Sequence, residues 1–315
     1  MGKNPKKVVI LVVGPTAAGK SELSLNLCQE LPAEIISADS RQIYKYMDIG
    51  TAKPSKEILN SIPHHFIDIL EPDEHYSAGQ FGLHAREMID HIFARDKVPL
   101  VVGGSGLYIK ALLEGFFIGD SIDLKIRESL RQRLIREGSE ALYSNLLKVD
   151  PQSASQIHPN DSQRILRALE VYLSTGKKLS DLHRAKVPLP DFIPLKFGIV
   201  KERSMLYRDI DQRVERMFQM GLLKEVATIL QMGFDKTLNS LNTVGYKEVI
   251  QYLDGKIDYQ TCINLIKQNS RHYAKRQLTW FRADTEIRWH KIETTDDFKT
   301  ITQKIIKKYQ ETLNR

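Results

Sequence analysis

The stretch that decides the fold is residues 8–21, which read VVILVVGPTAAGKS. It opens with an unbroken apolar, mostly β-branched run, which is typical of a strand buried on both faces of a parallel sheet. The part from Gly14 to Ser21 matches the pattern G-x-x-x-x-G-K-[ST] in full, and the leucines that follow recur at helical spacing. A strand, this loop and a helix in that order predict a site for a di- or triphosphate.

Each part of this loop has a physical role in phosphate binding. Its backbone N–H groups turn toward one point, and the N-terminus of the following helix adds a partial positive charge. The glycines allow backbone angles and a close approach that a side chain would block. Lys20 adds a full positive charge, and the Ser21 hydroxyl is placed to hold Mg²⁺. The predicted diphosphate-binding residues are Gly14, Pro15, Thr16, Ala17, Ala18, Gly19, Lys20 and Ser21.

The composition is that of an ordinary globular protein. Of the 315 residues, 27% are charged and 42% are hydrophobic, and this length is enough for two domains. No apolar run approaches the length of a membrane span. Cys28 and Cys262 are far apart in the chain and can build neither a disulfide framework nor a zinc site. We expect a monomeric protein of the reducing cytoplasm that does not bind a membrane.

Positive charge is concentrated in the later part of the chain. Residues 1–119 contain 12 Lys and Arg against 14 Asp and Glu, whereas residues 120–315 contain 34 against 25. A near-neutral phosphate-binding part followed by a basic part suggests a polyanionic partner for the latter. A solvated basic surface is the alternative that charge alone leaves open.

Strand and helix patterns alternate in the first part of the chain. Strands are predicted over 8–13, 33–37 and 98–102, a turn and a short strand within 62–69, and helices after the phosphate-binding loop, over 77–95 and from about 107. This alternation predicts a P-loop NTPase-like α/β fold, in which a parallel sheet carries helices on both faces.

The pattern changes near residue 119. A charge-rich helical segment covers 124–147, and no strand is predicted before 195–200. We therefore expect a mostly helical insertion domain over 120–195 between two parts of an α/β core domain, 1–119 and 196–315. Further helices are predicted over 203–220, 222–232, 246–253 and 259–280, followed by a strand over 286–289 and a basic terminal helix.

One carboxylate follows the phosphate-binding loop closely. Asp39 comes just after the strand predicted over 33–37, and ligands of open α/β sheets bind beyond the carboxyl ends of the strands. A single carboxylate beside a phosphate can bind a metal or take a proton from a nucleophile. The structural alternative is a helix cap at the start of residues 40–44, because Asp is favoured in that position.

The phosphate-binding loop alone does not name a reaction. No N-K-x-D guanine signature occurs, and the strand over 98–102 ends in Gly-Gly-Ser rather than in an acidic pair. These absences disfavour a GTPase and a motor ATPase. Two other classes remain open, a small-molecule kinase with a basic lid and a non-enzymatic RNA-binding switch gated by a nucleotide. Both predict that ATP or GTP binds.

Ordered blocks of sequence between about residues 9 and 282 narrow the choice further. They read GPTAAGKS, ISADSRQIY, MDIGTAKP, HHFIDI, YSAGQF, PLVVGGSGLYIKALLEG, IHPNDSQRILRALEVY, NTVGYKE and KRQLTWFR. In these blocks the chain resembles the tRNA dimethylallyltransferases of the bacterial type, also called tRNA isopentenyltransferases. That family transfers a dimethylallyl group from dimethylallyl diphosphate to N6 of the adenosine just 3′ of the tRNA anticodon and releases diphosphate. The resemblance implies that the loop binds a prenyl diphosphate and that the tRNA anticodon stem-loop is the partner.

The resemblance also implies roles for single residues. Asp39 matches the general base of the family, Ser105 the hydroxyl residue of its GGT block, and Arg213 an arginine that contacts the diphosphate. Together with Lys20 these are the predicted catalytic residues, and Mg²⁺ held by Ser21 is the expected cofactor. Asp209, close to Arg213, stands where many members carry a basic residue.

The predicted tRNA contacts come from the same blocks and from the charge-rich helical segment. They are Asp39, Ser40, Arg41, Gln42, Ser105, Arg127, Gln163, Arg164, Ile165, Leu166, Arg167, Asn242, Thr243, Val244, Gly245, Tyr246, Lys247, Lys275, Arg276, Gln277, Leu278, Thr279, Trp280, Phe281 and Arg282. Arg164 and Arg167 lie three apart, so one helix face presents both to phosphates or bases.

Two of these residues have structural alternatives. Trp280 is as compatible with the core as with stacking on a base, and Ser105 can cap a helix instead of contacting adenine. An adenylate isopentenyltransferase, which modifies a free nucleotide, is a close alternative within the same chemistry. The basic later region favours tRNA over it. The target adenine must then be swung out of its stack to reach the phosphate site.

Overall fold

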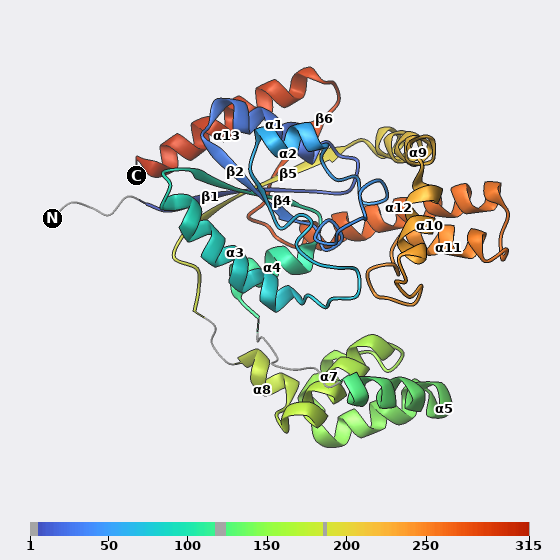
Figure 1. Cartoon of the computed structure of the whole chain (residues 1–315). Coiled ribbons are helices and arrows are strands. Elements are labelled where there is room, and N and C mark those ends of the chain that lie inside the picture. Colours follow the sequence, from blue (N-terminus) through green and yellow to red (C-terminus); the bar gives the residue numbers. More distant parts are fainter. Residues whose placement is uncertain (1–5, 117–123, 185–187, 315) are drawn as a thin grey trace.

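A six-stranded parallel sheet organises the chain (Figure 1). The computed structural model describes residues 6–116, 124–184 and 188–314. The strands lie in the order β3-β2-β4-β1-β5-β6, and every neighbouring pair is parallel. They are β1 (Val8–Val13), β2 (Ala33–Ala38), β3 (His64–His65), β4 (Val98–Gly103), β5 (Ile193–Lys201) and β6 (Arg288–Ile292). The predicted α/β fold with a parallel sheet is confirmed.

Helices cover both faces of the sheet. On one face lie α1 (Lys20–Glu30) and α13 (Asp296–Leu313), and on the other α3 (Ala78–Phe93) and α4 (Gly106–Glu114), while α2 (Lys56–Ser61) is a short connecting helix (Figure 1). Side chains of β1 alternate between two hydrophobic cores: Val8, Ile10 and Val12 pack with α1 and α13, and Val9, Leu11 and Val13 with α3 and α4. Burial on both faces explains why this strand is apolar throughout.

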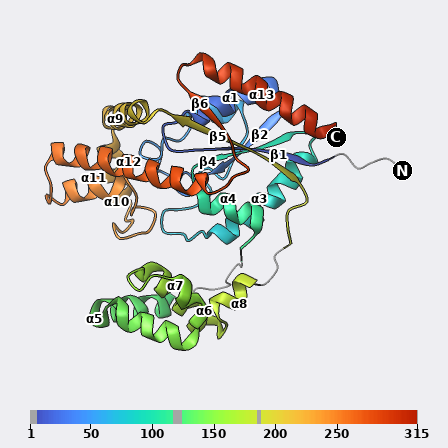
Figure 2. The same cartoon turned by 180° about the vertical axis from the view of Figure 1, so that it is seen from behind.

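A group of helices extends from the carboxyl edge of the sheet. It comprises α9 (Arg203–Met220), α10 (Leu222–Gln231), α11 (Tyr246–Leu253) and α12 (Tyr259–Arg282). Figure 2 shows that α12 runs from the far end of this group back to the sheet, beside α4. Polar residues from this group can therefore face the ends of β1, β2 and β4.

Helices α5 (Leu124–Val149), α6 (Pro151–Gln156), α7 (Ser162–Thr175) and α8 (Leu179–Arg184) pack around a core of their own, which includes Leu142, Leu146 and Ile165. Buried Asp150 joins α6 to α8, because its carboxylate accepts hydrogen bonds from the amide and hydroxyl of Ser153 (3.0 and 2.6 Å) and of Ser180 (3.0 and 2.7 Å). Burial alone would raise the pKa of Asp150, but these hydrogen bonds outweigh it and lower the pKa to about 2.

Arg86 of α3 fixes the two places where the chain leaves and rejoins the core. Its guanidinium donates to the carbonyl oxygen of Leu112, near the end of α4, at 2.8 Å, and to that of Pro188 at 2.6 Å. One side chain thus contacts both the last turn of α4 and the segment before β5.

The short strand expected within 62–69 is β3, which ends at His65 because the positive φ of Phe66 (66°) interrupts the extended backbone. Two other local expectations were wrong. The last strand begins at Arg288 rather than 286, since residues 284–287 form a turn closed by the Ile287 amide on the Asp284 carbonyl. Residues 40–44 form turns rather than a helix. Within the described residues, no helix is both long and apolar enough to cross a membrane.

Candidate active site

The phosphate-binding loop connects β1 to α1 in the predicted way. Gly14 has a φ of 146°, and a Cβ there would lie 2.5 Å from the carbonyl oxygen of Ile199. Gly19 has a φ of 99° and caps α1, so Lys20 and Ser21 are the first residues of that helix. Only glycine adopts such angles without strain. The loop and the helix N-terminus therefore present backbone N–H groups at the carboxyl end of β1.

The Lys20 ammonium lies over this loop. It donates to the carbonyl oxygens of Gly14 (3.0 Å) and Pro15 (2.8 Å). Burial lowers the pKa of Lys20 to about 8, Asp39 opposes this shift, and Arg213 adds to it. A buried ammonium held this way is stabilised when an anionic ligand arrives beside it.

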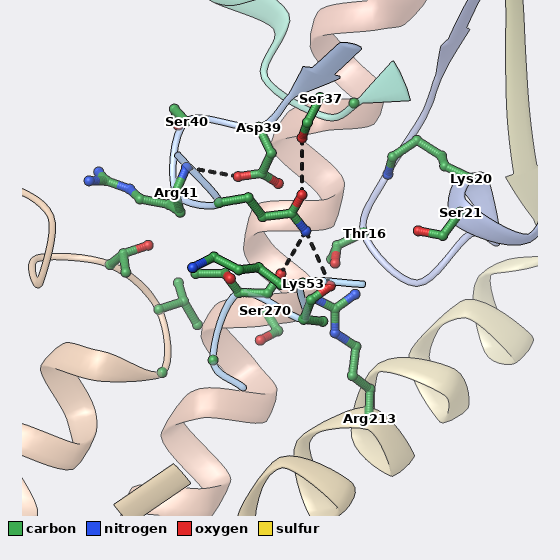
Figure 3. A pocket seen from close by; sticks show the side chains of 18 of the residues that line it. Thr16, Lys20, Ser21, Ser37, Asp39, Ser40, Arg41, Lys53, Arg213 and Ser270 are labelled. Atoms are coloured by element: carbon green, nitrogen blue, oxygen red, sulfur yellow. Dashed lines mark hydrogen bonds between the residues drawn. The ribbon is translucent and has the colours of Figure 1, made fainter. Parts of the chain in front are cut away.

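A cavity of about 580 Å³ opens beside the loop, and three of the four predicted catalytic residues line it, whereas Ser105 does not (Figure 3). Lys20 and Ser21 line it from α1, Asp39 from the end of β2, and Arg213 from α9. Other lining residues come from the segments 50–55 and 242–245, from Lys247 and from α12. The fold thus brings together, around one cavity, segments that are spread along the chain from Thr16 to Gln277.

Arg213 faces the cavity without a fixed partner. Burial lowers the pKa of its guanidinium, the nearby Asp39 opposes this, and Arg216 adds to it. Among the described residues, no hydrogen bond or ion pair engages the guanidinium. A partly buried cation in this state is suited to bind an anion from outside the protein.

Asp39 lies in a turn at the end of β2. One of its carboxylate oxygens accepts a hydrogen bond from the Arg41 amide at 2.9 Å (Figure 3). The helix-cap alternative is wrong, because no helix follows at 40–44. Within the described part of the chain this is the one hydrogen bond that the carboxylate receives, so Asp39 keeps capacity to accept a proton or a further hydrogen bond.

Ser105 stands at the N-cap position of α4 but does not cap it with its side chain. Its hydroxyl accepts a hydrogen bond from the Ser40 amide at 3.0 Å, and so ties the loop after β4 to the turn that carries Asp39. The hydroxyl of Tyr273, on α12, also lies within hydrogen-bonding reach of Ser105. Burial raises the pKa of Tyr273 to about 12, so this hydroxyl stays protonated. Tyr273 lines the cavity and was not predicted from the sequence.

Gln277 was predicted to contact tRNA, but the structure gives it another task. Its side chain is buried, its carbonyl oxygen accepts from the Thr16 amide at 2.8 Å, and its amide donates to the Gly104 carbonyl at 2.9 Å. Gln277 also lines the cavity, so its contact with tRNA stays a prediction beside this structural role. It braces the phosphate-binding loop against α12.

The opposite face of α12 is exposed and basic. A shallow groove of about 440 Å³ is lined by His272, Lys275, Arg276, Thr279 and Trp280. Trp280 lies over Gly106, where a Cβ would come within 2.2 Å of its ring, and its side chain remains 44% exposed. The alternative of a core position for Trp280 is thus wrong. Arg276 lines both this groove and the cavity, so the two are adjacent.

Three other predicted tRNA contacts are buried. Ile165 belongs to the core of α5–α8, and Tyr246 and Phe281 belong to a core of the α/β part. Their side chains are at most 2% exposed, so the prediction of direct contact was wrong for them. Ile165 and Phe281 are each next to an exposed residue, Arg164 and Trp280, since a helix presents only one face to solvent.

Arg127 and Arg167 are both paired with an acidic side chain of α7. Both donate to the buried carboxylate of Glu170, at 2.7 and 3.0 Å. Burial lowers the pKa of His75, in the loop before α3, and the nearby Arg127 and Arg167 lower it further. This cluster therefore lies where α5–α8 face the loop before α3. Arg164, by contrast, is exposed and has only a loose ion pair with Asp161 at 3.4 Å.

The donor set for a divalent cation is small. No cluster of three or more His, Cys, Asp or Glu side chains within residues 6–116, 124–184 and 188–314 could hold a metal ion. The Ser21 hydroxyl is exposed to the cavity and takes part in no hydrogen bond with another described residue. One protein hydroxyl fits Mg²⁺, which commonly keeps several waters and binds mainly through substrate phosphates.

The fold and the cavity together define a P-loop protein with an anion site at the carboxyl edge of its sheet. Comparison with known proteins specifies it further. The sequence model of the IPP transferase family matches residues 42–284. The chain is 46% identical over 306 residues to a protein of Pelotomaculum thermopropionicum named tRNA dimethylallyltransferase, and 96% of each chain is covered. A protein of the same name from Thermotoga maritima is 45% identical and covers 95% of this chain and 97% of its own.

Solved structures agree with this result. The full-length tRNA isopentenylpyrophosphate transferase of Bacillus halodurans superposes with a TM-score of 0.71 at 37% identity, over 97% of this chain and 98% of its own. A eukaryotic dimethylallyltransferase acting on tRNA gives a TM-score of 0.76 at 29% identity, over 91% of this chain and 74% of its own. This chain belongs to the IPP transferase family, the family of the tRNA dimethylallyltransferases.

Proposed function

We propose that this chain transfers a dimethylallyl group from dimethylallyl diphosphate to N6 of the adenosine immediately 3′ of the anticodon in tRNA, and that it releases diphosphate. The observation that carries the proposal is one cavity with cations at its phosphate end and a carboxylate beside them, Lys20 and Arg213 with Asp39. The relatives named tRNA dimethylallyltransferase, and the eukaryotic dimethylallyltransferase that acts on tRNA, support these substrates.

The cationic end stabilises the leaving group. Negative charge grows on the diphosphate as the bond between its oxygen and C1 of the dimethylallyl group breaks. Lys20, the loop amides and Arg213 are in place before the reaction and therefore lower the energy of this charge. Mg²⁺, entering with the diphosphate and bound by Ser21, would add further neutralisation.

Asp39 accepts the proton. The N6–C1 bond forms while the C1–O bond breaks, the electron pair of the broken bond leaves with the diphosphate, and the proton of N6 goes to the Asp39 carboxylate. The amine of adenine is a poor nucleophile, so a positioned base is worth about 10²- to 10⁴-fold in rate. The single hydrogen bond from the Arg41 amide orients this carboxylate without saturating it.

The tRNA lies over the exposed face of α12 in this proposal. Lys275, Arg276 and Arg282 supply charge for the phosphates, and Trp280 offers a ring for a base to stack on. Helices α5–α8 hold the anticodon stem-loop from the other side through exposed residues such as Arg164. Since Arg276 lines both groove and cavity, an adenine swung out of the loop has a short path to Asp39.

Incubation with labelled dimethylallyl diphosphate, Mg²⁺ and unmodified tRNA, followed by nucleoside analysis, tests the proposal. We expect label in N6-(dimethylallyl)adenosine and diphosphate as the other product. A parallel reaction with ATP in place of the prenyl donor is the control. Loss of the terminal phosphoryl group of ATP, without transfer of label from the prenyl donor, would contradict the proposal and indicate a kinase.

A further inference from the structure

The carboxylate of Glu225, in the first turn of α10, is surrounded by hydrogen-bond donors from two distant segments. It accepts from the amides of Asp48 (3.0 Å), Ile49 (2.7 Å) and Gly50 (3.1 Å), and from the hydroxyl of Tyr246 (2.6 Å). Three successive amides that converge on one anion form a nest, a geometry that binds negative charge well. Here the protein fills the nest with its own side chain.

The contact fixes the backbone at residues 48–50. Hydrogen bonds to a carboxylate are roughly twice as strong as neutral ones, and the N-terminal position of Glu225 on its helix also favours its negative charge. Tyr246 closes the other side, since a Cβ at Gly50 would lie 2.4 Å from its ring. Burial and the Glu225 carboxylate raise the pKa of Tyr246, so its phenol remains a donor.

The fixed segment continues directly into the wall of the cavity. The carbonyl oxygens of Thr51 and Ala52 accept hydrogen bonds from the Gln42 amide at 3.2 and 3.1 Å. The Gln42 carbonyl oxygen in turn accepts from the Ser37 hydroxyl at 3.0 Å (Figure 3). Ser37 and Gln42 bracket Asp39 in the sequence, so this chain of contacts holds the turn that carries the carboxylate on both sides.

We infer that Glu225 is a positioning residue for the prenyl transfer. Its carboxylate holds residues 48–52, and these hold Gln42 and thereby the orientation of Asp39. Glu225 does not line the cavity that would take the substrates. The inference rests on the proposed function, because it concerns the base of that reaction. The network of Glu225 and Gln42 therefore supports the Asp39 end of the site, whereas Lys20 and Arg213, at the phosphate end, form no hydrogen bond with it in the described part of the chain.

A structural role and a positioning role predict different results for Glu225→Gln. The variant keeps the shape of the side chain but has no charge. Its NH₂ group would face N–H or O–H donors that the carboxylate of Glu225 accepts from. If Glu225 only stabilised the fold, the melting temperature would fall and kcat per folded molecule would stay the same. A positioning role lowers kcat instead, because misplacement by about 1 Å can cost about 10²-fold in rate.

The first experiment measures kcat with saturating tRNA and the Kd of inorganic pyrophosphate for wild type and Glu225→Gln, at a temperature where circular dichroism shows both fully folded. We expect kcat to fall by about 10- to 100-fold while the Kd of pyrophosphate stays within about twofold. Glu215→Gln is the matched control, since Glu215 lies on α9 and, among the residues that the structure describes, forms an ion pair with Lys267 alone, at the surface. Its kcat should equal that of wild type.

The second experiment is a double-mutant cycle with Gln42→Ala. If Glu225 acts through Gln42, the double variant loses little more than the worse single variant. Independent, multiplicative losses would overturn the inference, as would a wild-type kcat for folded Glu225→Gln. If Glu225→Gln does not fold, Tyr246→Phe, which removes one of the four donors, replaces it in the cycle. Failure of the proposed function itself would appear separately, as wild-type protein that makes no prenylated tRNA.

Discussion

Asp39 in the α/β part and Asp150 among helices α5–α8 show how differently two regions of one molecule treat a carboxylate. Asp150 is buried and accepts four hydrogen bonds from two serines, whereas Asp39 faces a cavity and accepts one from a backbone amide. A carboxylate with every lone pair engaged fixes the packing around it. One with spare capacity beside buried cations is available for chemistry. Four experiments test or sharpen this contrast.

The largest effect is expected for Asp39→Asn. The variant keeps the size of the side chain and cannot take up the N6 proton, so kcat with saturating tRNA should fall by about 10²- to 10⁴-fold. Binding of pyrophosphate should remain, because Lys20 and Arg213 are unchanged. Product formation is measured by nucleoside analysis under single-turnover conditions. Full turnover by this variant would remove Asp39 from the role of base.

Lys20 should make pyrophosphate binding depend on pH. An anion favours the charged ammonium, whose pKa in the free protein is about 8. The contribution of Lys20 to affinity should therefore be nearly complete below about pH 7 and fall about tenfold for each pH unit well above about pH 8. The ratio of Kd values for Lys20→Met and wild type between pH 7 and 10 measures this, because titration of the ligand itself cancels. A ratio constant across this range would contradict the assignment.

Asp150→Asn should loosen α5–α8 without changing the sheet. The folded-state pKa of about 2 lies below the ordinary value of 3.8, so the ionised form adds about 2 kcal/mol of stability. This stability is complete above about pH 4 and is lost as the pH falls through about 2. Hydrogen exchange should speed up in α5–α8 of the variant, while fluorescence of Trp280 and Trp289, both outside these helices, stays unchanged. Asp181→Asn, an exposed change on α8, is the control.

The smallest effect is expected for Arg164→Ala. Exposed Arg164 should contact one phosphate, so its loss should weaken tRNA binding several-fold and reduce the slope of log affinity against log salt by about 1. Binding is measured between about 50 and 200 mM salt. Lys307→Ala is the control, because α13 lies on the opposite side of the sheet from α5–α8 (Figure 1). Equal slopes for Arg164→Ala and wild type would remove Arg164 from the tRNA surface.

The parts of the site that the sequence predicted depend on local patterns. The spacing from Gly14 to Ser21 is a property of one loop, and Asp39 follows a strand whose apolar run is visible in the sequence. The buried Ile165 and Tyr246 were misplaced because a block of sequence does not say which helix face is turned inward. The role of Glu225 was missed because its partners at 48–50 are about 175 positions away, and only the fold brings them together.

Helix α12, which carries Gln277, contacts two different parts of the site. Its inner face braces the phosphate-binding loop through the Thr16 amide, while its outer face carries the basic groove around Arg276 and Trp280. The single helix α12 thus supports both the phosphate-binding loop and the basic groove. A displacement of α12 by a ligand bound in the outer groove would therefore also move the phosphate-binding loop.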